Sequence, residues 1–157
     1  MLPILGGITL KSQIIMMGYT TPPSLEDMTT IAEEIIDELP EGIDKYIGKL
    51  RVEVEDFPDD YIMEELDLGS PYDVYGVYQT SRPKALNRTA SASKNQDVLY
   101  LYRRPILDAW CETQDDFLCL LNRIIIQEIG YHFGFTDDEI EMYEDEMAPE
   151  DNLIMCE

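Results

Sequence analysis

A long helical pattern in the second half of the chain constrains the fold more than any other feature. On a helical wheel of residues 114–133, with about 100° between neighbours, apolar side chains such as Phe117, Leu121 and Ile124 fall on one line. Glu128 continues that line. A carboxylate on a buried helix face costs several kcal/mol unless it is paired, hydrogen-bonded or neutralised. The pattern therefore predicts a buried helix with one carboxylate in an unusual environment.

Two accounts of this carboxylate are open. If the helix end leaves the core, Glu128 is solvated or forms an ion pair with Arg103 or Arg104. If the helix end stays covered, Glu128 lines a cleft in which it can act on a water molecule or a proton. The first account is structural and the second is functional.

The rest of the chain alternates helical and strand patterns. A capping pair of Ser24 and Asp27 opens an amphipathic helix that Pro40 ends. The alternation of side chains and the β-rich content predict three strands, at residues 50–55, 74–79 and 98–102. The polar run from Thr80 to Gln96 predicts a long loop. This order predicts an α/β (α+β) fold, a compact two-layer domain with a small mixed sheet packed against helices.

The ends of the last two helices have their own signals. The spacing of Thr113 and Asp116 predicts a cap for the long helix, and Gly134 is a typical place for it to end in a left-handed conformation. Thr136 with Glu139 predicts the cap of a final acidic helix. Both helices therefore belong to the predicted domain.

Composition limits the function. A chain of 157 residues with 45% apolar content predicts one globular domain. Its net charge of -22 makes nucleic acid and anionic membrane surfaces poor partners. Six of the eleven basic residues fall within residues 82–104, where Asp97 is the only acid: Arg82, Lys84, Arg88, Lys94, Arg103 and Arg104. This segment either balances the acidic remainder or forms a contact loop for an acidic ligand or partner.

The cysteines and the N-terminus predict a cytoplasmic location. Three cysteines without C-x-x-C spacing, at positions 111, 119 and 156, indicate reduced thiols rather than a disulfide framework or a thiolate zinc site. The apolar N-terminus lacks the basic start of a signal peptide and is too short an apolar run to span a bilayer.

The segment IQEIGYHFGFTD, residues 126–137, carries the candidate site. On the helical wheel Gln127, Glu128, Tyr131 and His132 occupy one continuous arc. In the zinc-peptidase pattern H-E-x-x-H, two histidines four apart bind one metal and the glutamate activates the metal-bound water. Here the two ligand positions hold Gln127 and Tyr131, and an amide or a neutral phenol is a poor zinc ligand.

The only histidine, His132, lies one residue beyond the second ligand position. A lone histidine at a helix end is usually structural. However, Glu128 and His132 are four residues apart and could hold a metal weakly with Asp137 as a third ligand.

Several stretches in the same order resemble the bacterial minimal zincins, a metallopeptidase family with a matrix-metalloprotease-like domain and a signature close to H-E-I-G-H-H-F-G-x-x-D. They are QEIGYHFGFTD, LYRRPILDAW, VEVEDFPDD, LGSPYDVYGVYQ and PPSLEDM, spread over residues 22 to 145. The resemblance implies that Glu128 matches the general base, Gly134 the turn after the helix, and Asp137 the third metal ligand. Gln127 and Tyr131 stand where the two histidine ligands belong. His132 matches an additional histidine of the signature.

The resemblance, with its two lost ligands, implies a zincin-like protein with a degenerate zinc site. We expect no zinc, and a catalytically inactive pseudo-peptidase that binds a peptide or protein partner along a sheet edge. One alternative is a metal-dependent peptidase that uses Glu128, His132 and Asp137. Another is a purely structural or assembly role.

The resemblance also implies a domain layout. Residues 1–21 are expected to be an N-terminal extension, 22–147 the zincin-like domain and 148–157 an acidic C-terminal tail. Because the resemblance begins near Pro22, Met16 or Met17 is an alternative translation start to Met1.

Overall fold

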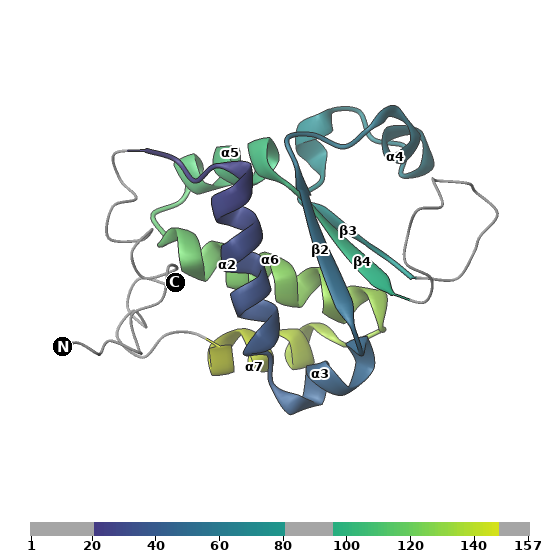
Figure 1. Cartoon of the computed structure of the whole chain (residues 1–157), viewed down its shortest axis with the longest axis vertical. Helices are drawn as coiled ribbons and strands as arrows, with labels where there is room; N and C mark the ends of the chain where they lie inside the picture. The colour runs from purple at the N-terminus through teal and green to yellow at the C-terminus, as the bar shows by residue number, and fades with distance from the viewer. Residues whose placement is uncertain (1–20, 81–95, 148–157) are drawn as a thin grey trace.

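A small mixed sheet forms the framework of the chain (Figure 1). The computed structural model describes residues 21–80 and 96–147. The strand order is β2-β4-β3, in which β2 runs parallel to the central strand β4 and β3 runs antiparallel to it. In chain order the strands are β2 (Leu50–Glu55), β3 (Gly76–Gln79) and β4 (Asp97–Tyr102). The predicted α+β fold with a small mixed sheet is confirmed.

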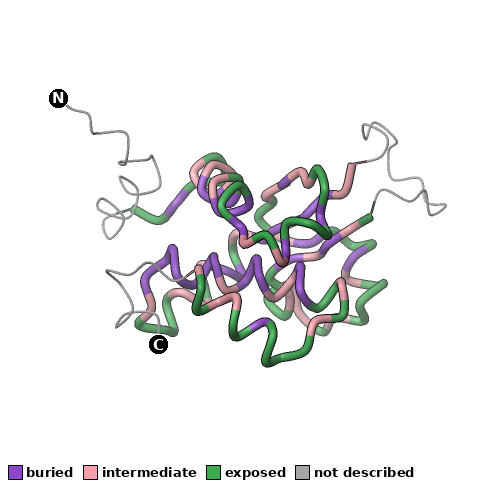
Figure 2. The backbone as a smooth tube through the Cα atoms, turned by 90° about the horizontal axis from the view of Figure 1, so that it is seen from below, coloured by how far each residue is buried: buried purple, intermediate pink, exposed green. Residues whose placement is uncertain are grey.

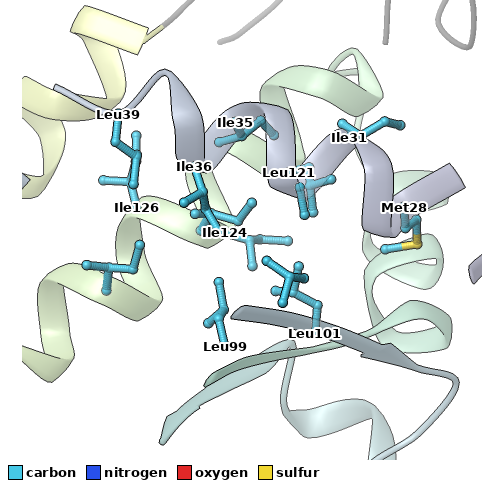
Figure 3. Close-up of a cluster of buried hydrophobic side chains, with 14 of the residues drawn as sticks. Met28, Ile31, Ile35, Ile36, Leu39, Leu99, Leu101, Leu121, Ile124 and Ile126 are labelled. Carbon is cyan, nitrogen blue, oxygen red and sulfur yellow. The ribbon is translucent and has the colours of Figure 1, made fainter. Parts of the chain in front are cut away.

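Two helices cover one face of this sheet. Helix α2 (Leu25–Asp37) packs over β2, and α6 (Phe117–His132) packs over β3 and also against α2. Leu99 and Leu101 of β4, two residues apart, point into the space between the layers. Figure 3 shows the side chains from α2 and α6 that meet them, including Met28, Ile31, Ile35, Leu121 and Ile124. Each such buried side chain stabilises the fold by roughly 2 kcal/mol.

The start of α2 follows the sequence signal. The Ser24 hydroxyl accepts a hydrogen bond from the Asp27 backbone N–H, and the Asp27 carboxylate accepts one from the Ser24 N–H, each at 3.0 Å.

Two short helices were not predicted. Pro40 precedes α3 (Glu41–Ile47), and α4 (Asp60–Glu65) follows β2. A helix of seven or six residues is too short to show a repeating apolar face.

The predicted start of the long helix is wrong. Helix α5 (Arg103–Glu112) ends at Thr113, whose hydroxyl donates to the carbonyl of Trp110 at 3.4 Å, so Thr113 serves the preceding helix. Asp116 occupies the N-cap position of α6, but its side chain makes no cap hydrogen bond. As a result α6 begins at Phe117 rather than at residue 114.

The predicted end of α6 is confirmed. Gly134 adopts a φ of +81°, which only glycine reaches without strain. The chain then enters α7 (Asp137–Met147). The Thr136 N–H donates to the Glu139 carboxylate at 2.8 Å, and the Glu139 N–H donates to the Thr136 hydroxyl at 3.2 Å, which is the predicted reciprocal cap.

The segment between β2 and β3 differs from the prediction at its end. The 3-10 helix η1 (Pro71–Asp73) has Val74 as its C-cap, so β3 starts at Gly76, two residues later than predicted.

Figure 2 shows the buried positions gathered where helices and sheet face each other. No helix in the described ranges is long and apolar enough to cross a membrane.

The cysteines correct one expectation. Cys119, buried in α6, is disulfide-bonded, so the prediction of reduced thiols is wrong for this residue, whereas Cys111 carries a free and exposed thiol. The predicted polar loop Thr80–Gln96 falls almost entirely on residues 81–95, outside the described residues.

Candidate functional site

The C-terminal half of α6 lies over the edge strand β3, and the spacing of the two elements matches. Four residues of a helix advance by about 6 Å and two residues of a strand by about 6.6 Å. The Cγ atom of Glu128 is 3.5 Å from the place of a Cβ atom on Gly76. Four residues later, the imidazole of His132 stacks on Tyr78 with 4.2 Å between ring centroids. Both motif residues therefore face β3.

Gly76 is packed tightly against the central strand β4. A Cβ atom at this position would lie 2.6 Å from the backbone oxygen of Tyr100 and 3.1 Å from a methyl carbon of Leu101. A glycine inside a strand is a recognised sign of close approach by another group. That signal was present in the sequence, but it did not identify Glu128 as the neighbour.

Glu128 is half-buried and lacks a counter-charge. Burial raises its pKa from the ordinary value of 4.5 to about 7. Among the described residues no cation forms an ion pair with it. Arg103 and Arg104 instead approach the same carboxylate oxygen of Asp56, at 3.3 and 3.8 Å, so the expected pairing of either arginine with Glu128 is wrong. Near neutral pH this carboxyl group can therefore exchange a proton.

Gln127, at the first ligand position, faces α7 instead of a metal. Its side-chain amide donates to a carboxylate oxygen of Glu144 across 3.5 Å. Arg123, one turn earlier, lies 3.6 Å from the other oxygen of Glu144 and 2.6 Å from Asp115. Burial raises the pKa of Glu144, and the contacts with Gln127 and Arg123 oppose that rise. The amide thus belongs to a polar contact between two helices.

Tyr131, at the second ligand position, is also bonded to α7. Its hydroxyl donates to the Asp137 carboxylate at 3.1 Å. This hydrogen bond is the largest cause of a raised pKa of the phenol, with further contributions from the charges of Asp137, Glu144 and Glu128. The ionised form that would suit a metal is therefore harder to reach than in a free tyrosine.

His132 has a structural setting at the edge of the sheet. Beneath it, the hydroxyl of Tyr78 donates to Asp97 at 2.6 Å. Burial of the phenol, followed by the bond and charge of Asp97, raises the pKa of Tyr78. Desolvation lowers the pKa of His132, against the opposing charge of Asp97. The imidazole is thus held flat against β3.

These residues do not fit a zinc site. The two positions that should carry imidazoles hold an amide and a protonated phenol, each already hydrogen-bonded to a carboxylate. The alternative ligands Glu128, His132 and Asp137 have separate contacts. His132 stacks on Tyr78, whereas Asp137 accepts the hydrogen bond from Tyr131. Within the described residues no group of three or more His, Cys, Asp or Glu side chains lies close enough to hold a metal ion.

The sequence did not predict most of the residues that contact α6 in the site. Those on α7 and β3 were missed because only tertiary packing brings them there; they are Glu144, Gly76 and Tyr78. Asp137 was predicted as a metal ligand, and it accepts the hydrogen bond from Tyr131 instead. The basic contact-loop residues Arg82, Lys84, Arg88 and Lys94 lie outside the described residues.

Comparison with known protein families places the chain in one of them. A family described as zincin-like metallopeptidase matches residues 47–147, which include the sheet, α6 and α7. Comparison with curated proteins gives no match. Because the family match covers well over half of the chain, the protein belongs to the zincin-like metallopeptidase family.

Proposed function

We propose that this protein is a pseudo-peptidase that binds an extended peptide segment of a partner by strand addition to β3. The observation that carries the proposal is the position of Glu128 beside an edge strand while the two ligand positions are occupied with contacts to α7. A zincin scaffold without zinc-binding side chains keeps a surface for a peptide but lacks the metal-activated water molecule.

The hydrogen-bond pattern of β3 supports this mode of binding. Tyr102 N–H donates to the carbonyl of Tyr75 at 2.9 Å. Directly opposed residues of antiparallel strands alternate between bonded and non-bonded pairs. From the register of β3 on β4, Val77 and Gln79 therefore bond to β4, whereas the backbone groups of Gly76 and Tyr78 point away from it.

The backbone groups of β3 that point away from β4 belong to the residues that lie beside the candidate site. Gly76 and Tyr78 are also the residues that face Glu128 and His132. In the described part of the sheet β3 has β4 as its one neighbour. A peptide strand added there would hydrogen-bond to Gly76 and Tyr78 and pass beside Glu128.

Hydrogen–deuterium exchange on β3 tests the proposal, with a random library of short peptides as the probe. We expect the Gly76 and Tyr78 amides to exchange quickly in the free protein and slowly once a selected peptide is bound. The Val77 amide, bonded to β4, should be slow in both states and is the internal control. Failure to select any peptide, or protection confined to β2, would overturn the proposal.

Metal analysis tests the claim that the protein binds no zinc. Protein purified without added metal should contain no stoichiometric zinc, and a chelator should change neither its fold nor its peptide binding. Stoichiometric, chelator-sensitive zinc would contradict the pseudo-peptidase assignment. A cytoplasmic location and the domain limits at residues 22 and 147 remain predictions of the sequence.

A further inference from the structure

We propose that the β3 edge is selective for a peptide carrying lysine or arginine at the position beside Gly76 and Glu128. This inference rests on the proposed function, since it specifies which extended segment the edge accepts.

A peptide strand added to β3 would place alternate side chains on the face of the sheet that α6 covers. The side chain opposite Gly76 meets no side chain from β3, because glycine has none. Opposed Cβ positions on neighbouring strands are about 5 Å apart, and the Cγ atom of Glu128 is 3.5 Å from the Cβ position of Gly76. A long side chain on the peptide can therefore reach the carboxyl group of Glu128 directly.

The charge around this place is negative. Asp137 accepts the hydrogen bond from Tyr131, and Glu144 lies 3.5 Å from the amide of Gln127, so two further carboxylates contact the same turn of α6 that carries Glu128. On the same helix, Arg123 forms ion pairs with Asp115 and Glu144. Glu128 is left without a cation among the described residues, on a chain of net charge -22.

Different peptide side chains would meet this carboxyl group on different terms. An apolar side chain would desolvate Glu128 further without pairing it, and an acidic one would add repulsion. A lysine or arginine would supply the missing counter-charge and a charge-assisted hydrogen bond. The same match favours a basic partner during encounter.

The test uses peptides chosen by the library selection, remade with Lys, Arg, Gln, Leu or Glu at the position opposite Gly76. A charged hydrogen bond of the usual strength predicts about a tenfold or greater preference for Lys or Arg over Gln or Leu. In Glu128→Gln this preference should disappear.

A matched control separates this contact from the general negative charge. Glu141→Gln removes an exposed carboxylate of α7 and should keep the preference. Equal affinity for neutral and basic peptides would overturn the inference while leaving strand addition in place. A preference that survives in Glu128→Gln would also overturn it, and absence of any peptide binding would remove both proposals.

Discussion

The Cγ atom of Glu128 lies 3.5 Å from the place where Gly76 would carry a Cβ atom. The side chain that bears the carboxyl group therefore lies between α6 and the edge strand β3. The raised pKa of Glu128 thus belongs to a side chain that is covered where α6 packs on β3.

Gly76→Ala should destabilise the protein. The added Cβ would lie 2.6 Å from the backbone oxygen of Tyr100, which cannot move without bending the sheet. Overpacking of this kind costs about 1–3 kcal/mol, measurable by urea denaturation. Gly69→Ala is the control, because its nearest neighbour, Asp73, would be 3.7 Å away. Equal stability of the two variants would contradict the close approach of Gly76 to the backbone of β4.

Glu128→Gln should stabilise the protein at alkaline pH and change its pH dependence. Burial favours the protonated carboxyl group, so ionisation weakens the folded state as pH rises from about 4.5 to about 7. The full difference corresponds to at most roughly 3 kcal/mol. The free energy of unfolding should therefore fall more between pH 5 and pH 8 in the wild type than in the variant, by up to about that amount. Parallel pH profiles would contradict this account.

Restoring both imidazoles should create a zinc site. Gln127→His together with Tyr131→His releases Glu144 and Asp137 from their present hydrogen bonds and supplies two ligands one turn apart. We expect zinc by elemental analysis, and a rise in melting temperature with added zinc, in the double variant only. The double alanine variant is the control for loss of the α7 contacts. Zinc in the wild type, or none in the histidine variant, would oppose the expectation.

Ile140→Ala should loosen α7 from α6. Ile140 is 2% exposed and lies against Gly130, where an added Cβ would come within 2.8 Å of it. Removing such a buried side chain costs about 2–5 kcal/mol. Met142→Ala on the same helix, at a position 52% exposed, should cost little. Amide exchange in α7 and chemical denaturation would measure both, and similar losses would indicate that α7 is held by its polar contacts instead.

Local signals predicted the parts of the fold that depend on neighbouring residues. The reciprocal bonds of Ser24 with Asp27 and of Thr136 with Glu139 form within four residues, so their spacing was sufficient. Gly134 was predictable for the same reason. Thr113 misled because two helices meet at it, and the sequence did not show which one it would serve.

Long-range contacts explain what the sequence could not predict in the site. The wheel placed Glu128 on the buried line of α6, but its neighbour Gly76 lies 52 positions earlier in the chain. Gln127 reaches Glu144 because α7 folds back along α6, and these two residues lie 17 positions apart in the chain. Likewise, Arg103 donates to the carbonyl of Pro23 and pairs with Asp56, two partners that lie far from it in the sequence.

The match between a four-residue step on α6 and a two-residue step on β3 bears on how the chain can vary in evolution. Insertion or deletion of one residue between Glu128 and His132 would rotate one of them by about 100° away from the strand. Substitution at positions 127 and 131 leaves that alignment intact. The spacing of the motif can therefore be preserved by natural selection for packing alone, even in lineages whose metal ligands have been replaced.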